Sequence, residues 1–287
     1  MILPRKSPSD INTPPLVSVI IPAYNRFELL MQAAASVLAQ DMTDFELLIV
    51  DDGSEEEIST AAGTGDERVR VIRIRHTGLP GLVRNRGAEA AKGRYLAFLD
   101  SDDLWKPEKL GLQTAFFAEH SGSRICHTRE VWDRDGRTVS QSSQRHRREG
   151  DVFEDALKKC ILGPSTVMME REFYLETGGF REDLEIAEDY EYWLRITAYH
   201  RVGYIDMPLT VKRAGSWEQL SEKHGQIEVF RIRGLKGLVD SGFFPPERED
   251  AARKELARKC RIYAEGCRKR GRNAEAGEYE AVARRYI

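Results

Sequence analysis

The stretch FELLIVDDGS, residues 45–54, is an apolar run that ends in adjacent carboxylates. A second stretch of the same kind, RYLAFLDSDD, occupies residues 94–103 and also ends in acids. Each apolar run predicts a strand that is buried on both faces of a sheet. Ligands of open α/β sheets bind at the carboxyl ends of the strands, so acids at this edge predict a cation that holds a diphosphate. The acids are Asp51, Asp52, Asp100, Asp102 and Asp103.

The residues around these stretches predict an alternation of strands and helices. LVSVIIPAY at 16–24 is a third buried strand, and Asn25 is expected to cap a helix over 27–39. An exposed strand over 68–74 and a helix over 81–91 follow. Strands that alternate with helices form parallel sheets with right-handed crossovers. We therefore expect an α/β fold with a Rossmann-like, mostly parallel sheet flanked by helices.

The rest of the chain is less regular and ends in a helical extension. Strands over 123–128 and 130–139 are expected, the second folding into a hairpin at Asp135-Gly136. The other expected elements are helices over 109–119, 151–160 and 188–199, strands over 165–169 and 202–212, and terminal helices over 230–239, 250–270 and 274–286.

Composition excludes several classes of protein. The net charge of −3 over 287 residues gives no reason to expect nucleic-acid binding. No apolar run approaches the roughly 18–20 residues that span a bilayer, and the polar, proline-broken start does not resemble a signal peptide. We therefore expect a cytoplasmic protein without a transmembrane segment. The four cysteines form no C-x-x-C pair, which indicates reduced, structural thiols.

The segment from Gln226 onward is cationic although the whole chain is not, because Lys and Arg outnumber Asp and Glu there. Its helices are expected to pack against the rest of the chain or against a second subunit in a homodimer. The alternative is attraction to anionic lipid, which would hold the protein peripherally at the inner face of the membrane.

The spacing of the acids suggests metal binding. Asp100 and Asp102 stand two residues apart at a strand end, so their side chains would share a face in extended geometry. Carboxylate oxygens suit Mg²⁺ or Mn²⁺, and such a site needs only one or two of them. The alternative is that Asp102 or Asp103 caps a helical turn. Tyr24 would stack on a base, and Asp52 would either bind that base or mark a turn.

Four segments resemble, in order, the successive motifs of the family 2 glycosyltransferases. They are PLVSVIIPAYNR, DFELLIVDDGS, LPGLVRNRGAEAAKGRYLAFLDSDD and GGFREDLEIAEDYEYWLRI, and they span about residues 15–212. The resemblance implies the GT-A fold, a nucleotide-diphosphate sugar donor, a divalent metal (Mn²⁺ or Mg²⁺) and transfer with inversion. We expect a UDP-sugar as donor and a hydroxyl acceptor, on a glycan or a lipid-linked molecule, in cell-surface glycan or polysaccharide synthesis.

The resemblance also implies roles for individual residues. Glu188-Asp189 would supply the base that takes the acceptor's proton, with Asp189 favoured, and a helix N-terminus would keep both acids charged. Arg84 would approach the base or the diphosphate, with Arg86 as its competitor. The nucleotide sugar would be bound by Pro22, Ala23, Tyr24, Asp51, Asp52, Arg84, Asp100 and Ser101, and the metal by Asp102 or Asp103.

The chain departs from the family pattern after the last strand, where many relatives carry a histidine. Lys212 and Arg213 occupy that place here, and the next histidine is His224. Either the basic pair neutralises the leaving diphosphate, or His224 reaches in from a closing loop.

The organisation implied is a flexible tail over 1–14, a GT-A catalytic domain over 15–225 and a basic helical extension over 226–287. Within the domain, residues up to 105 would form the nucleotide-binding half and those from 106 the acceptor half. Two rival functions are a nucleotidyltransferase, which would normally show a glycine-rich loop near the first strand, and a non-catalytic nucleotide-sugar-binding protein. No G-x-G-x-x-G follows a predicted strand, which argues against dinucleotide binding.

Overall fold

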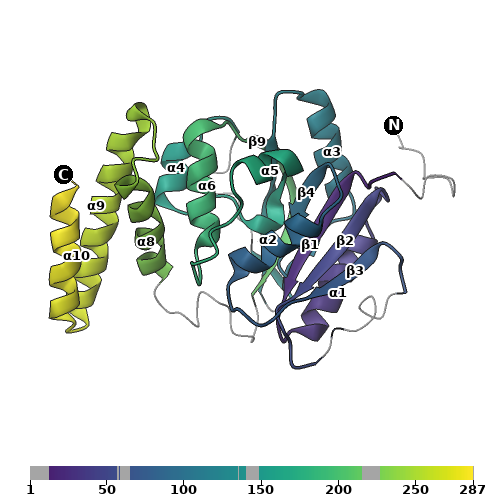
Figure 1. Cartoon of the computed structure of the whole chain (residues 1–287), viewed down its shortest axis with the longest axis horizontal. Helices are drawn as coiled ribbons and strands as arrows, with labels where there is room; N and C mark the ends of the chain where they lie inside the picture. Colours follow the sequence, from purple (N-terminus) through teal and green to yellow (C-terminus); the bar gives the residue numbers. More distant parts are fainter. Residues whose placement is uncertain are drawn as a thin grey trace.

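The computed structural model describes residues 13–56, 58, 65–134, 136–139, 149–214 and 227–286. The elements of its first part are β1 (Val17–Ala23), α1 (Phe27–Leu38), β2 (Phe45–Asp51), β3 (Val69–Arg73), α2 (Pro80–Ala90) and β4 (Tyr95–Phe98). β2 pairs in parallel with β1 and with β3, and β4 pairs in parallel with β1 (Figure 1). The parallel sheet predicted for this part of the chain is confirmed.

The strand order reverses direction at β1, so the strands on its two sides diverge at the end of this strand. β2 stays paired with β1 to Ala23, but the last pair between β4 and β1 is at Ile20. The carbonyl of Ile20 faces β4 and that of Ala23 faces β2, so Pro22 faces the β4 side. A proline, which has no N–H, fits there because the pairing with β4 has already ended. Ligands of α/β sheets bind at such a switch point.

The second part adds helices and antiparallel strands to the same sheet. Its elements are β5 (Leu104–Trp105), α3 (Lys109–Glu119), β6 (Ile125–Arg134), β7 (Arg137–Val139), α4 (Phe153–Lys158), β8 (Val167–Glu170), α5 (Arg171–Glu176), α6 (Glu188–Tyr199) and β9 (Gly203–Ala214). The strands of the described residues form one sheet in the order β3-β2-β1-β4-β8-β6-β9-β5, and β7 pairs with β6. The sheet is therefore parallel at one end and mixed at the other.

The two strands predicted over 123–128 and 130–139 are one strand, β6, followed by the short β7. β6 pairs with β8 on one side and with β9 on the other, and its register with β9 shifts on both sides of Arg129. The expected break at Arg129 is therefore a bulge, which bends a strand without ending it. Asp135 of the predicted turn lies outside the described residues.

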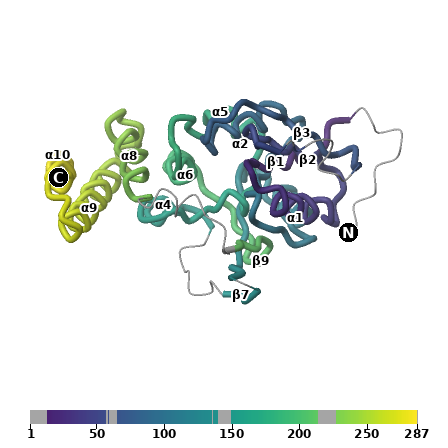
Figure 2. Tube along the Cα trace, turned by 90° about the horizontal axis from the view of Figure 1, so that it is seen from below, coloured from purple at the N-terminus to yellow at the C-terminus, as the bar shows by residue number. Residues whose placement is uncertain are grey.

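Helices cover both faces of the sheet, and alternate side chains of β1 enter separate cores. Val19 packs in the core that includes α1 and α3, whereas Ile20 packs in the core that includes α2 and α6. Figure 2 shows α1 on one side of β1, with α2 and α5 on the other. Burial on both faces explains why β1 is a near-continuous apolar run.

Asn25 does not cap α1, contrary to the prediction. The residue before the helix is Arg26, which makes no capping hydrogen bond through its side chain. Asn25 instead adopts a positive φ of 48°, and its Oδ1 accepts the N–H of Glu55 at 2.8 Å. Asparagine tolerates this left-handed backbone conformation, so it can join the loop after β1 to the loop after β2.

The C-terminal extension consists of α8 (Ile227–Asp240), α9 (Pro246–Lys269) and α10 (Asn273–Arg285), at one end of the molecule (Figure 1). α8 packs on α6, and α9 packs on α4, α8 and α10. Gly234 of α8 is so close to α6 that a Cβ there would lie 3.2 Å from Cβ of Glu191. The expected packing against the rest of the chain is confirmed. No helix in the described ranges combines the length and apolarity that a membrane crossing requires.

Candidate functional site

Asp52, at the end of β2, anchors the loop that follows β3. Its Oδ1 accepts the N–H of Thr77 at 2.8 Å and the hydroxyl of Thr77 at 3.0 Å. Its Oδ2 accepts the N–H of Gly78 at 2.9 Å, and the side chain is buried. These donors engage both carboxylate oxygens, so Asp52 shapes the edge of the site through the loop that it holds.

Asp51 is also engaged by the fold. Its Oδ1 accepts the N–H of Ser54 at 2.9 Å, the geometry of the turn that the sequence suggested as one alternative. Its Oδ2 pairs with Nη1 of Arg73 at 2.9 Å, and the carboxylate is only 1% exposed. Asp51 therefore stabilises the turn after β2 and ties it to β3.

Tyr24 and His76 form an aromatic platform beside Asp52. Their rings stack with centroids 4.0 Å apart and planes inclined by 17°. Nδ1 of His76 lies 2.9 Å from the carbonyl oxygen of Asp52, which fixes the ring. Tyr24 is 39% exposed, so the platform is accessible at the end of β1. Such a surface suits the face of a nucleobase.

The segment from Asp100 to Asp103 is a turn, because the N–H of Asp103 donates to the carbonyl of Asp100 at 3.0 Å. The prediction that Asp100 and Asp102 share a face assumed an extended strand and is wrong. The carboxylate of Asp100 contacts Arg84, whereas that of Asp102 contacts Arg26. Ser101, between the acids, is buried in the turn.

Arg84 of α2 joins the acids after β4 to the acids that begin α6. Its Nη2 lies 2.6 Å from Oδ1 of Asp100, and its Nη1 lies 2.6 Å from Oε1 of Glu188. The guanidinium side chain is only 7% exposed. Burial alone would raise the pKa of Asp100, but the charges of Arg84 and Lys212 hold it below its ordinary value. Arg84 is therefore not a surface arginine, since it bridges two acids of the protein. Arg86, its predicted competitor, pairs with Glu89 at the surface.

Asp103 is a buried member of this cluster. Its Oδ2 accepts the hydroxyl of Ser165 at 2.6 Å and lies 3.4 Å from Nζ of Lys212. Burial raises the pKa of Asp103 to about 7, against the opposing charge of Lys212. Lys212 also lies 3.7 Å from Asp100, so its ammonium group balances the acids of the turn.

Asp102 is more accessible than the neighbouring Asp103: its side chain is 16% exposed, against 4% for Asp103. Its Oδ2 pairs with Nη1 of Arg26 at 3.0 Å, and the side chains are 16% and 24% exposed. Arg213 donates through Nε to the carbonyl of Asp102 at 2.5 Å, so the second residue of the basic pair supports the backbone of the turn. His224 lies outside the described residues. In the part of the chain that the structure describes, no group of three or more His, Cys, Asp or Glu residues is arranged to hold a metal ion.

Glu188 does not behave as its place at a helix N-terminus predicts. It is 5% exposed, and burial raises its pKa to about 7 although Arg84 acts in the opposite direction. The expectation that the helix dipole keeps both acids charged is therefore wrong for Glu188, because desolvation outweighs the dipole. Trp193, on the same helix, is buried in the core.

Asp189 is less buried than Glu188 and has a different environment. Its Oδ1 accepts the N–H of Tyr190 at 2.7 Å, and its Oδ2 lies 3.3 Å from Sγ of Cys160. The charges of Arg84 and Arg231 also act on this carboxylate. Arg231 belongs to α8, so the extension contributes to the electrostatics of the site.

Several residues of the site were not predicted, among them His76, Cys160 and Ser165. His76 follows the exposed strand predicted over 68–74, so its position at the carboxyl edge of the sheet was a usable signal. Ser165 supports the acidic turn twice, since its Oγ also accepts the N–H of Asp100 at 3.0 Å. Nothing near Ser165 or Cys160 in the sequence indicates these contacts, which cross between distant segments.

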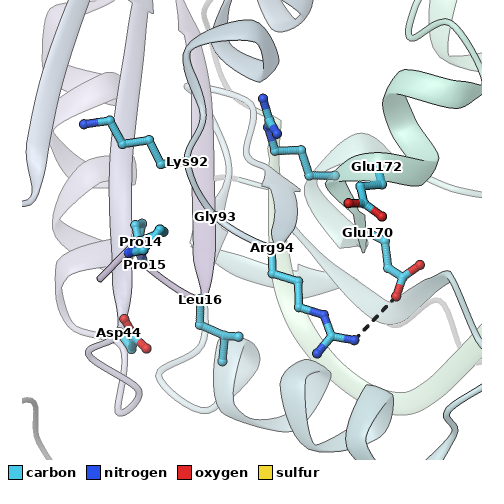
Figure 3. Close-up of a pocket in the computed structure, with 10 residues that line it drawn as sticks. Pro14, Pro15, Leu16, Asp44, Lys92, Gly93, Arg94, Glu170 and Glu172 are labelled. Carbon is cyan, nitrogen blue, oxygen red and sulfur yellow. Dashed lines mark ion pairs between the residues drawn. The ribbon is translucent and has the colours of Figure 1, made fainter. Parts of the chain in front are cut away.

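A cavity of about 530 Å³ lies elsewhere, near Leu16, Asp44 and Gly93 (Figure 3). These residues precede β1, β2 and β4, so the cavity is at the amino edge of the parallel strands. Arg94 and Glu170 line it and form an ion pair at 3.7 Å. Its position at the edge opposite the acids separates it from the candidate site.

Comparison with solved structures shows the fold. S. aureus TarS in complex with UDP-GlcNAc superposes with a TM-score of 0.64 at 18% identity, covering 94% of this chain and 91% of that chain. Mannosyltransferase PcManGT from Pyrobaculum calidifontis, in complex with GDP-Man and Mn²⁺, gives 0.65 at 16% identity, covering 95% and 76%. The expected GT-A fold is confirmed.

Sequence comparisons add relatives. An uncharacterized glycosyltransferase of Rickettsia felis is 35% identical over 199 residues, which cover 69% of this chain but 33% of that protein, so the chain spans about a third of its length. The Escherichia coli UDP-Glc:alpha-D-GlcNAc-diphosphoundecaprenol beta-1,3-glucosyltransferase WfgD is 28% identical over 195 residues, covering 67% of this chain and 73% of WfgD. Residues 18–178 match the family model described as Glycosyl transferase family 2. The chain belongs to glycosyl transferase family 2.

Proposed function

We propose that this chain is an inverting glycosyltransferase that moves a sugar from a UDP-sugar to a hydroxyl acceptor in cell-surface glycan synthesis. The observation that carries the proposal is the Arg84 bridge, which joins Asp100 at the end of β4 to Glu188 at the start of α6. The bridge holds a donor-side acid and the candidate base pair in one buried network. UDP-GlcNAc in TarS and the UDP-Glc donor named for WfgD support a uridine nucleotide.

In the proposed reaction, the acceptor oxygen attacks the anomeric carbon as its proton passes to Asp189, and the bond from that carbon to the diphosphate breaks. We favour Asp189 over Glu188 as base because Glu188 is only 5% exposed and its Oε1 is engaged by Arg84, whereas Asp189 is partly exposed. Tyr24 and His76 would support the base of the nucleotide. Lys212 would balance charge that develops on the departing diphosphate.

We propose Asp102, rather than Asp103, as the carboxylate that holds a divalent metal. Asp103 is 3% exposed and engaged by Ser165 and Lys212, whereas Asp102 is partly exposed and pairs with Arg26 at the surface. One carboxylate is enough when phosphate oxygens and water complete the coordination. When bound, the metal would supply positive charge to the leaving diphosphate. The Mn²⁺ complex of PcManGT supports the use of a divalent metal.

A panel of nucleotide sugars, assayed with Mn²⁺ or with a chelator, tests the proposal. We expect metal-dependent release of a nucleoside diphosphate, and loss of transfer in Asp102→Asn. Release of pyrophosphate would indicate a nucleotidyltransferase instead. Calorimetric binding of the sugar nucleotide without turnover, across acceptors, would indicate a non-catalytic binding protein.

We also propose the division into a catalytic domain over 15–225 and an extension that holds a cytoplasmic enzyme peripherally at the membrane, where a lipid-linked acceptor would be found. The acceptor named for WfgD, a diphosphoundecaprenol, supports this idea. Acidic residues lie beside the arginines of α9, as in Arg253–Glu249 and Arg258–Glu255, and offset their positive charge, so the attraction should be weak. Co-sedimentation with anionic vesicles at low and high salt tests the membrane contact, and light scattering tests for a homodimer.

A further inference from the structure

The thiol of Cys160 contacts the carboxylate that we propose as the base. Its Sγ lies 3.3 Å from Oδ2 of Asp189 and 3.3 Å from the carbonyl oxygen of Leu162. A thiol has one hydrogen to donate, and a charged carboxylate is a stronger acceptor than a carbonyl. The other oxygen of Asp189 accepts the N–H of Tyr190. Both oxygens of the carboxylate are therefore held, one by an amide and one by the thiol.

The surroundings keep this thiol protonated. Burial and the neighbouring charge of Asp189 raise the pKa of Cys160 well above its ordinary value. The opposing charges come from Arg231 on α8 and Lys212 on β9, while Arg84 and Glu188 face the same carboxylate from α2 and α6. A neutral thiol is a hydrogen-bond donor, so the contact with Asp189 is attractive at neutral pH.

Cys160 differs from the other three cysteines of the chain. Cys126, Cys260 and Cys267 are 0% exposed and belong to the hydrophobic cores. Cys160 is partly exposed, lies in the segment after α4 and has its sulfur on a functional carboxylate. Cys160 also packs against the core beside α4 and α6, but of the four thiols it is the one whose sulfur contacts a carboxylate among the described residues.

We propose that Cys160 is a positioning residue for Asp189, and that its S–H group fixes the orientation of the carboxylate. This inference rests on the proposed function, in which Asp189 takes the proton of the acceptor. A hydroxyl in the same place would orient the carboxylate equally well. Because an O–H group stabilises the charged form more strongly, it would also lower the basicity of Asp189.

The pH dependence of kcat and of kcat/KM tests this role in Cys160→Ser and Cys160→Ala. In the serine variant we expect the acidic limb to move to lower pH, with the orientation kept. In the alanine variant we expect the acidic limb to move to higher pH and kcat to fall roughly three- to tenfold, the value of one lost hydrogen bond. KM for the donor should not change in either variant.

Cys267→Ala is the matched control, since it removes a buried thiol from α9 without touching the site. Its pH profile should coincide with that of the native chain. A merely structural role for Cys160 predicts the same shape of profile in all variants. Superimposable acidic limbs for the native chain, Cys160→Ser and Cys160→Ala would therefore overturn the proposal.

A second measurement does not depend on activity. The rate at which iodoacetamide alkylates Cys160, followed by mass spectrometry of its peptide, should rise in Asp189→Asn. Removing the carboxylate charge lowers the pKa of the thiol, and each pKa unit gives roughly tenfold more thiolate. An unchanged rate would show that the two groups do not interact and would reject the inference. A faster rate together with undiminished transfer in Asp189→Asn would reject the proposed base, and with it the role of Cys160, while leaving the contact in place.

Discussion

The acids at the carboxyl edge of the parallel strands and Asp189, in the first turn of α6, have different hydrogen-bond partners. Asp52 accepts hydrogen bonds from two backbone N–H groups and a hydroxyl. Asp51 accepts hydrogen bonds from one backbone N–H group and an arginine. Asp189, by contrast, is contacted by a thiol and by the amide of Tyr190, and it is only partly buried. Strong donors lower the basicity of a carboxylate, whereas a weak donor preserves it.

This difference suggests that the acids after β2 have a structural role, whereas Asp189 has the catalytic role proposed for it. The carboxylates after β2 fix the loops at this edge of the sheet through their hydrogen bonds. The carboxylate of Asp189 is partly exposed, so an acceptor can reach it, as the proposed base requires. Arg84 joins the two regions through its ion pairs with Asp100 and Glu188. A substitution in one region should therefore alter the electrostatics of the other.

The largest effect should follow from Asp189→Asn, which removes the proposed base. We expect kcat to fall by about 10²–10⁴-fold, the usual contribution of general base catalysis. The affinity for the donor, measured by calorimetry, should not change, because the acids of the donor edge are intact. The exposed Glu176→Gln is the control and should keep full activity. If Asp189→Asn lost donor binding as strongly as turnover, the two regions would not have separate roles in donor binding and proton transfer.

The next largest effect should come from Arg84→Met, which removes the link between the regions. Two carboxylates would lose their buried partner, a change that typically costs about 3–5 kcal/mol of the free energy of unfolding. Arg84→Lys should be intermediate, since one ammonium group does not reproduce the fork that contacts both acids. Urea unfolding measures both values.

Arg86→Met is the matched control, two residues along the same helix. Its guanidinium is 40% exposed and pairs with Glu89 at the surface, so the change should stay within about 0.5 kcal/mol. Similar losses in the two methionine variants would show that Arg84 is an ordinary surface residue of α2.

The sequence predicted the regular elements well because their apolar periodicity is local. The helices expected over 109–119 and 188–199 coincide with α3 and α6, and the parallel strands with β1, β2 and β4. The contacts of the site were less predictable, since Arg84 and Glu188 are 104 positions apart. The role of Arg84 as a bridge depends on how α2 and α6 pack, which no spacing within one segment records.

Two errors have physical causes of the same kind. An extended strand would place Asp100 and Asp102 on one face, but the hydrogen bond from Asp103 to Asp100 closes a turn that separates their side chains. Glu188 was expected to be charged because it begins a helix, but burial raises its pKa. In both, a local rule was outweighed by the tertiary environment. The bulge at Arg129 is similar, because it arises from pairing with β9.

The buried acid of the bridge should make stability depend on pH. Since the folded state raises the pKa of Glu188 from 4.5 to about 7, the folded state binds the proton more tightly than the unfolded state. This contribution is fully present below pH 4.5 and is lost as the pH rises through about 7. In the native chain, this group should make the free energy of unfolding decline by at most about 1.4 kcal/mol per pH unit in that range. Glu188→Gln should remove this decline.

Urea unfolding at several pH values, with the native chain and Glu188→Gln side by side, measures this difference. Glu185→Gln, which changes a 44% exposed acid just before α6, is the control and should run parallel to the native chain. Parallel curves for all three proteins would mean that Glu188 is ionised in the folded state, and that the two acids of the pair do not differ as proposed.

The smallest effect is expected from Thr77→Val, beside Asp52 at the carboxyl edge of the parallel strands. The change removes the hydroxyl that donates to Oδ1 of Asp52 at 3.0 Å but keeps the shape of the side chain and both backbone donors. The hydroxyl also accepts the N–H of Leu79 at 3.2 Å, so two hydrogen bonds of the loop are lost. The free energy of unfolding should fall by about 1–3 kcal/mol, and activity should be nearly native. A carboxylate held by redundant donors tolerates such a loss, whereas Asp189, held on one side by a single thiol, should respond in its pH profile to Cys160→Ala. If Thr77→Val shifted the acidic limb of kcat as far as Cys160→Ala, the donor-edge acids would share in the proton transfer, and the contrast between the two regions would have to be abandoned.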